Sequence, residues 1–379
     1  MINAAEIPVT PSGLTAAYDG ASDGDVLVLE SGAYAGTLTF PSGKTITIKA
    51  AEGADVKFGN LFRANDASLT GGGIILDGLN VYITDSYFIN LDNYGDIKTI
   101  TMRNCDIANI GRCLLRTNNA GNSIDEIVFD NCVIHDCGNG GWNFMYPKHI
   151  VKSVSVTNST LCNYANGESF FMPNAADTDN DFSFTFTNNT VYRWGKSNDR
   201  ALAKTEKKYS ANSTYTFTDN IIYKGGADGI KPYIVHAASG KLVAHNNLVV
   251  DYGEYNITDK TVNDLTMEGI GINALPFANP DGGDFTVPST SPLATASTTG
   301  GIIGDPRWLK TVTQAVTLTV AATPAEGGTV SPAQAVLNSG DEATLSATAN
   351  YGFRFKEWQD AEGKTLSTEN PYTMTVSAD

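Results

Sequence analysis

The stretch 102–107 reads MRNCDI, and FDNCVI follows at 129–134. The same phrase (apolar, polar, Asn or Asp, small or polar, apolar) returns as VTNSTL, FTNNTV, FTDNII and VAHNNL. Its Asn or Asp lies at positions 104, 131, 158, 188, 219 and 246, so the gaps are 27, 27, 30, 31 and 27 residues. A repeat near 27 residues with strand-like alternation in each copy predicts the coils of a β-solenoid.

The repeated Asn falls where each predicted strand gives way to a turn. Asn side chains in successive coils can hydrogen-bond to one another and to the turn backbone, so we predict a structural Asn ladder. Cys105 and Cys132 follow the ladder one coil apart, with Ser159 next, and are expected to stack as small apolar residues. A disulfide between neighbouring coils is compatible with this spacing but is not required. Among the histidines, His135 and His245 are expected to be structural.

The composition limits the partners. Acidic residues number 41 and basic residues 25, for a formal net charge of −16. This balance argues against nucleic acid, whose phosphates need a basic footprint. It does not exclude an acidic glycan, because a local Arg and Lys patch or bound Ca²⁺ can invert the field. The sequence has no apolar run near the roughly 18 residues that span a bilayer.

The N-terminal stretch 14–34, LTAAYDGASDGDVLVLESGAY, predicts a short amphipathic helix, a Gly-Asp turn and an apolar strand. It resembles the opening of pectate-lyase-like parallel β-helix proteins, in which a capping helix closes the solenoid. The motifs LPF at 275–277, GDFTV at 283–287 and GDPRW at 304–308 resemble the closing segment of such proteins from gut Bacteroidetes. The resemblance implies an all-β, right-handed parallel β-helix over 1–308 that acts in glycan use.

Residues Met1–Pro8 lack the basic start and apolar stretch of a signal peptide. The chain is therefore either cytoplasmic or begins after its signal. The family resemblance favours the second alternative, a secreted or cell-surface protein.

A second resemblance lies at the C-terminus. The motifs GGTVSP at 327–332, YGFRFKEW at 351–358 and NPYTMTV at 370–376 resemble bacterial surface repeats similar to internalin B-repeats. They imply a small β-grasp-like or sandwich-like domain over 315–379, after a linker at 309–314. Since such repeats usually have one more strand, the domain is expected to be truncated.

Charged residues gather in one part of each middle coil. Arg116 and Arg200 both lie 12 residues after their ladder Asn, and Arg112 and Lys196 both lie eight residues after it. Strands of neighbouring coils stack about 4.8 Å apart, so equal offsets predict columns on one outer face. Because the coils differ in length, the columns can also slip by a residue or more. A merely solvated charged face is the alternative interpretation.

Elimination from a uronate-containing polysaccharide needs a base, neutralisation of the carboxylate and an acid. The candidate catalytic residues are Arg116, Arg200 and Lys204. The candidate sugar contacts are Arg112, Trp142, Tyr146, Phe170, Lys196 and Tyr233. Glu168 and Asp199 are candidate ligands of Ca²⁺, the expected cofactor, and the spacing of Asp177, Asp179 and Asp181 resembles part of a Ca²⁺ loop without its closing Glu.

The sequence lacks the Arg-containing signature of pectate lyases and the Lys–Arg pair with carboxylate cluster of chondroitinase-B-like alginate lyases. No catalytic residue is therefore carried over from these families. We predict a monomeric polysaccharide lyase acting on an acidic plant or host glycan. The alternatives are a non-catalytic glycan-binding protein and an adhesin whose β-helix is a stalk, because a shared fold does not establish activity.

Overall fold

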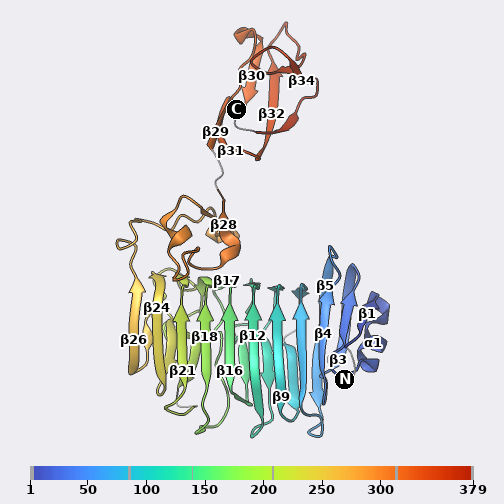
Figure 1. Cartoon of the computed structure of the whole chain (residues 1–379), viewed down its shortest axis with the longest axis vertical. Coiled ribbons are helices and arrows are strands. Elements are labelled where there is room, and N and C mark those ends of the chain that lie inside the picture. Colours follow the sequence, from blue (N-terminus) through green and yellow to red (C-terminus); the bar gives the residue numbers. More distant parts are fainter. Residues whose placement is uncertain (1–3, 84–86, 139, 207–208, 312–314, 377–379) are drawn as a thin grey trace. The chain divides into compact units, whose positions relative to one another are not determined.

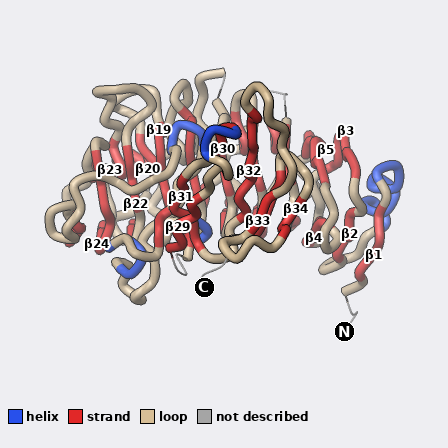
Figure 2. The backbone as a smooth tube through the Cα atoms, turned by 90° about the horizontal axis from the view of Figure 1, so that it is seen from above, coloured by secondary structure: helices blue, strands red, loops and turns tan. Residues whose placement is uncertain are grey.

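Three parallel sheets run along the N-terminal part of the chain, and successive coils add one strand to each sheet in turn. The computed structural model describes residues 4–83, 87–138, 140–206, 209–311 and 315–376. Figure 1 shows the strands of the first sheet side by side along this part, with the helix α1 (Leu14–Gly20) at its N-terminal end. In Figure 2, the first sheet (β2, β4, β24) and the third (β3, β5, β20, β23) lie along opposite sides.

The first sheet consists of β1 (Glu6–Val9), β2 (Val26–Leu29), β4 (Thr45–Ala50), β6 (Gly72–Asp77), β9 (Ile97–Arg103), β12 (Ser123–Asp130), β15 (Ile150–Val151), β16 (Ser153–Thr157), β18 (Ser183–Thr187), β21 (Thr214–Thr218), β24 (Lys241–Val250) and β26 (Asp259–Leu265). The second sheet consists of β7 (Asn80–Tyr82), β10 (Asp106–Ala108), β13 (Val133–His135), β17 (Thr160–Tyr164), β19 (Thr190–Trp194), β22 (Ile221–Tyr223) and the end of β24. The third sheet consists of β3 (Gly32–Thr39), β5 (Val56–Asn65), β8 (Tyr87–Asn93), β11 (Cys113–Thr117), β14 (Met145–Pro147), β20 (Ala201–Glu206), β23 (Tyr233–Ala237) and β25 (Tyr255–Asn256). This architecture confirms the predicted right-handed parallel β-helix.

Each coil turns from the first sheet to the second at the repeated Asn or Asp. These residues all have a left-handed backbone with φ between 50° and 60°, at Asn104, Asn131, Asn158, Asn188, Asp219 and Asn246. Asn and Asp tolerate this region better than other residues with a side chain, and the earliest copy has Gly78 there. A second left-handed corner follows five residues later, at Asn109, Asp136, Asn163, Arg193, Lys224 and Asp251.

The predicted ladder is present, and a second, buried ladder runs one residue after it. In the predicted row, Asn131 Nδ2 donates to Asn104 Oδ1 at 2.7 Å. In the buried row, Asn220 Nδ2 donates to Asn247 Oδ1 at 2.7 Å, and the Ser159 backbone N–H donates to Asn189 Oδ1 at 2.9 Å. Cys105 and Cys132 occupy the same buried row in earlier coils, as expected for small residues. All five cysteines are free and buried, so no disulfide links the coils.

Aromatic rings fill much of the core between the sheets. Tyr164 and Trp194 stack with centroids 4.3 Å apart, and Phe144 stacks on Phe170 at 5.3 Å. Such stacks run from one coil to the next, because equivalent positions of neighbouring coils point into the same layer. They make the interior a packed core rather than a channel.

The two ends of the solenoid are closed differently. At the start, α1 buries Leu14 and Tyr18, which confirms the predicted capping helix. At the other end, the inward-facing side of β26 carries polar residues: Lys260 Nζ donates to the Tyr255 carbonyl at 2.6 Å, and Asp264 accepts from Asn247 Nδ2 at 2.7 Å. Polar groups at these positions blunt an edge that would otherwise expose core and unpaired backbone.

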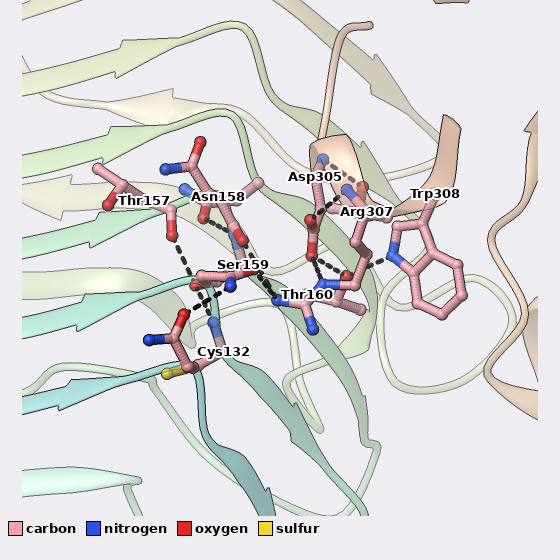
Figure 3. Close-up of polar contacts among 12 residues, drawn as sticks. Cys132, Thr157, Asn158, Ser159, Thr160, Asp305, Arg307 and Trp308 are labelled. Carbon is pink, nitrogen blue, oxygen red and sulfur yellow. Dashed lines mark hydrogen bonds and ion pairs between the residues drawn. The ribbon is translucent and has the colours of Figure 1, made fainter. Parts of the chain in front are cut away.

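A closing segment, residues 266–309, packs on the outer face of the second sheet. It contains the 3₁₀ turns η2 (Pro280–Gly282), η3 (Pro292–Thr295) and η4 (Pro306–Trp308). Figure 3 shows its end, where Trp308 Nε1 donates to Thr160 Oγ1 at 2.6 Å and Thr160 Oγ1 donates to Asp305 Oδ2 at 2.7 Å. Arg307 reaches Asp305 at 2.7 Å and Asn131 Oδ1 at 2.9 Å. The segment thus ties several coils together through their second sheet.

The chain divides into two units, 1–287 with 291–309, and 288–290 with 310–379. The division falls within β27 (Val287–Pro288) and within β28 (Leu309–Lys310). Of the expected linker 309–314, positions 312–314 lie outside the described residues. None of the described helices is long and apolar enough to cross a membrane.

The C-terminal unit is a small domain of antiparallel strands. Its strands are β29 (Ala315–Thr319), β30 (Gly328–Ser331), β31 (Gln334–Asn338), β32 (Glu342–Ala349), β33 (Trp358–Gln359), β34 (Thr365–Ser367) and β35 (Tyr372–Thr375), with the 3₁₀ turn η5 (Ala325–Gly327). β30, β32 and β35 form one sheet, and β29 pairs with β31. Its core centres on Leu345, Trp358 and Val376.

Candidate functional site

The outward-facing side chains of the third sheet form one row across successive coils. The strand register pairs Arg63 with Asn90, Asn90 with Arg116, and Arg116 with Tyr146. In the next two coils the pairs lie one residue earlier, at inward-facing positions: Met145 pairs with Phe171, and Phe171 pairs with Ala203. The register then pairs Lys204 with His236 and His236 with Asn256. We call this the outer row: Arg63, Asn90, Arg116, Tyr146, Met172, Lys204, His236 and Asn256.

The predicted columns of equal offset are wrong. Arg116 and Arg200 do not share a row, because Arg116 lies level with Tyr146 and Lys204, whereas Arg200 precedes β20 and contacts Glu168 instead. Arg116 and Lys204 are three strands apart, or about 14 Å at about 4.8 Å a step. The three predicted catalytic residues are therefore not neighbours in one row.

Arg116 lies beside aromatic rings. Its guanidinium lies 5.2 Å from the centroid of the Tyr87 ring, and Nη1 is 3.2 Å from Asn90 Oδ1 and 3.5 Å from Asp92 Oδ1. Arg112 lies over the Trp142 ring at 4.3 Å, and Trp142 meets Tyr146 edge to face at 5.5 Å. The structure thus brings together four of the predicted residues, Arg112, Arg116, Trp142 and Tyr146, on one surface.

Glu168 and Asp199 are bound by cations rather than arranged around a metal. Glu168 Oε1 is 2.9 Å from Lys196 Nζ and 3.3 Å from Arg200 Nη2. Asp199 is 2.7 Å from Arg200 Nη1 and also accepts a hydrogen bond from Ser197, which chiefly lowers its pKa. Within the described residues no three His, Cys, Asp or Glu side chains are grouped to hold a metal ion. This donor set does not fit the expected Ca²⁺.

Lys204 is a buried cation in the outer row, with a side chain only 7% exposed. Its Nζ donates to the Asp199 carbonyl oxygen at 2.9 Å and lies 3.5 Å from Glu206 Oε1. These contacts fix the ammonium below the surface of the row. There it adds positive charge to the row in a partly desolvated setting, where charge acts more strongly than in water.

Phe170 was predicted to stack on sugar, and this prediction is wrong. The side chain is fully buried and packs against Phe144 and Phe129 in the core. Tyr233 is half-buried, with its ring 5.0 Å from that of His236.

A cavity of about 600 Å³ opens at the far end of the outer row. Its polar lining includes Asp177, Glu206, His236, Asn256 and Thr258. Glu206 has a left-handed backbone, φ 45°, where β20 and β23 shift register. Among the described residues it is the one such residue, other than glycine, that lies outside the two corners. Bulges of this kind often re-aim side chains beside active sites.

His236 is the residue of this cavity that sequence reasoning missed. Its Nδ1 is enclosed without a hydrogen-bond partner. Burial chiefly, and then the charge of Lys204, lower the pKa of His236, so its imidazole is neutral at neutral pH. The stretch YIVHA, in which a His follows an apolar run of a strand, was the available signal.

One comparison with known proteins concerns the C-terminal part of the chain. A family model described as the divergent InlB B-repeat domain matches residues 318–379, which confirms the predicted C-terminal repeat. No curated protein matches the chain. Residues 318–379, which follow the β-helix, thus match the B-repeat model.

Two solved structures are similar to the β-helix. The PL6 family alginate lyase AlyGC is 17% identical with a TM-score of 0.47, over 69% of this chain and 39% of that one. The pectate lyase Pel9A is 14% identical with a TM-score of 0.39, over 80% of this chain and 96% of that one. This chain therefore spans about two fifths of the alginate lyase, 39% of its length. The likeness concerns the fold alone.

Proposed function

We propose that this protein binds an acidic polysaccharide along the outer row and cleaves it as a polysaccharide lyase. One observation carries the proposal: Arg63, Arg116 and Lys204 share one outward row on a parallel sheet. Successive coils place such side chains at multiples of about 4.8 Å along a line. A uronate chain presents repeated carboxylates along a line as well, and guanidinium groups pair with carboxylates bidentately.

The aromatic residues beside the row support the same ligand class. Tyr87, Trp142 and Tyr146 lie within ring contact of Arg112, Arg116 or one another. Aromatic rings can cover the apolar face of a sugar while the neighbouring cations bind its carboxylate. Polysaccharides are large polymers that a protein meets outside the cell, so the proposal includes secretion or display at the cell surface. The B-repeat domain at the C-terminus is compatible with that location.

The test is the ultraviolet absorbance of unsaturated uronate products during incubation with pectin, alginate and glycosaminoglycans. We expect one of these polymers to be cleaved by the native protein and its cleavage to be weakened in Arg116→Ala. Arg103→Ala is the matched control, because Arg103 also has one carboxylate partner, Asp77 at 2.8 Å, but lies on the first sheet. If both variants lost the same fraction of cleavage activity, the outer row would have no specific role in the reaction.

A second candidate is glycan binding without cleavage. It is favoured by the pairing of Lys196 and Arg200 with the carboxylates of Glu168 and Asp199, since paired charges are poorly placed to transfer protons. Retardation of a polysaccharide in an affinity gel, with no unsaturated product from any substrate, would establish this second function.

A further inference from the structure

We infer that His236 accepts the proton in the cleavage reaction and that the cavity beside it is the subsite where the bond breaks. This rests on the proposed lyase function. It assigns the chemistry to one end of the outer row, away from Arg116.

The imidazole of His236 is held by packing rather than by hydrogen bonds. Nδ1 is enclosed and unpartnered, and among the described residues neither ring nitrogen has a hydrogen-bond partner. The edge-to-face contact with Tyr233, with centroids 5.0 Å apart, fixes the ring from one side. Since Nε2 is neither hydrogen-bonded to a described residue nor enclosed, it can approach a ligand directly, and it accepts a proton in the tautomer that carries the hydrogen on Nδ1.

The cavity places His236 among groups suited to a sugar. Glu206 and Asn256 line the same 600 Å³ space, and both can bind hydroxyl groups. The backbone of Lys204 lies at the paired position on the adjacent strand, about 4.8 Å away, and its ammonium is held below the surface by the Asp199 carbonyl and Glu206. A uronate bound in the cavity would have its carboxylate in the field of this buried ammonium and its neighbouring carbon at the imidazole.

Several charged or titratable groups act on His236. Lys204 from β20 disfavours the imidazolium, whereas Glu206 and Asp199 favour it. Asp177 lines the cavity, and Tyr233 lies on the same strand. Burial and Lys204 outweigh the carboxylates, so the neutral imidazole, which is the form that accepts a proton, prevails at neutral pH.

The proposed elimination needs no reagent other than water. His236 Nε2 takes the proton from the sugar carbon next to the uronate carboxylate. The electron pair of that C–H bond forms a carbon–carbon double bond, and the bond from the adjacent carbon to the glycosidic oxygen breaks. The departing oxygen takes a proton from water, and His236 returns its proton to the resulting hydroxide.

Residues at different positions of the outer row then have different roles in the reaction. Arg116 lies four strands from His236, or about 19 Å, so it contacts a different sugar of the same chain. We therefore expect Arg116→Ala to raise KM, because it removes an interaction made equally before and during reaction. His236→Gln should lower kcat by about 100-fold or more, the usual contribution of a general base.

The test follows the imidazole NMR signals of the full-length protein while oligosaccharides from pectin, alginate and glycosaminoglycans are added. His236→Gln identifies the His236 signal by its loss. The matched control is His245→Gln, because His245 lies on the first sheet, where its side chain contacts Asn263. We expect the His236 signal alone to shift with the oligosaccharide that the protein cleaves, and the control to cleave normally.

The outcomes separate the two proposals. If an oligosaccharide is bound and cleaved while the His236 signal stays fixed, or if His236→Gln cleaves normally, the role of His236 is overturned and the lyase function stands. If a glycan is bound but none is cleaved, the catalytic role is overturned and glycan binding stands. If none is bound or cleaved, the proposed function fails and this inference fails with it.

Discussion

Asn220 connects three coils through its buried amide. Its Nδ2 donates to the Phe186 carbonyl and to Asn247 Oδ1, each at 2.7 Å, and its Oδ1 accepts from the Asn189 backbone at 2.8 Å. Asn220→Ala would leave several buried groups unpaired, at about 1–3 kcal/mol for each. We expect a loss of about 3 kcal/mol or more in the free energy of unfolding, measured by denaturant titration.

Asn212→Ala is the control for this loss, because Asn212 is exposed in the turn before β21. It should leave the free energy of unfolding unchanged. Equal stability of the two variants would show that the buried ladder contributes less than its hydrogen bonds indicate.

His135 carries a pH dependence of stability. Its ring nitrogens lie 3.0 Å from Asp106 and 2.7 Å from Asp136. The hydrogen bond to Asp106 most of all raises the pKa of His135 from 6.5 to about 9. Because the folded-state pKa is the higher one, the stabilisation is fully present below pH 6.5 and is lost as the pH rises through about 9.

The measurement is the free energy of unfolding of the native protein and of His135→Gln across this pH range. The difference between the two should be largest at the acidic end of the range and should shrink towards its alkaline end. A difference that does not change with pH would mean that the two carboxylates do not hold the imidazolium.

At the scale of elements, the closing segment depends on one buried carboxylate. Asp305 accepts from Thr160 Oγ1 and from the Arg307 guanidinium, each at 2.7 Å, and burial raises the pKa of Asp305. Asp305→Ala would leave these donors unpaired and is expected to cost about 3 kcal/mol. Because the segment packs on the outside of a complete solenoid, amide hydrogen exchange should accelerate in 266–309 much more than in β16 or β18.

Thr298→Ala is a suitable comparison, because its hydroxyl also anchors the segment, to Asp219 at 2.5 Å, but on a more exposed contact. It should accelerate exchange less than Asp305→Ala does. Uniform acceleration through all coils would show that the segment and the solenoid unfold together.

The elements of the first two sheets were predictable from sequence, whereas those of the third were not. The first corner demands Asn, Asp or Gly, so the ladder positions mark every coil. The loop from the second sheet to the third has no position that requires Asn, Asp or Gly, and its length varies from coil to coil. Thus Arg116, Tyr146 and Lys204 share a row although they lie 12, 15 and 16 residues after positions 104, 131 and 188. Equal offsets from the ladder consequently placed Arg200 in the wrong row.

For the whole molecule, the net charge is opposite in sign to the basic side chains of the outer row. The chain carries a formal charge of −16, whereas the outer row contains Arg63, Arg116 and Lys204, of which Arg116 is paired with Asp92 and Lys204 with Glu206. If the protein acts on an acidic glycan as proposed, the glycan is repelled at long range and attracted only at contact. The net charge of a protein affects the rate at which a charged ligand associates, whereas complementary charges at the contact surface affect the stability of the complex.

This opposition predicts an unusual salt dependence of glycan binding. At low salt the Debye length is about 30 Å, so the repulsion reaches the approaching glycan; at 0.1 M it falls to about 10 Å. Added salt should first speed association, because it screens the repulsion, and at higher concentration should speed dissociation, because it weakens the Arg116 contact. The measurement is stopped-flow tryptophan fluorescence with an acidic oligosaccharide, with a neutral one as control. An association rate that falls steadily from the lowest salt would mean that the cations of the outer row dominate the field even at long range.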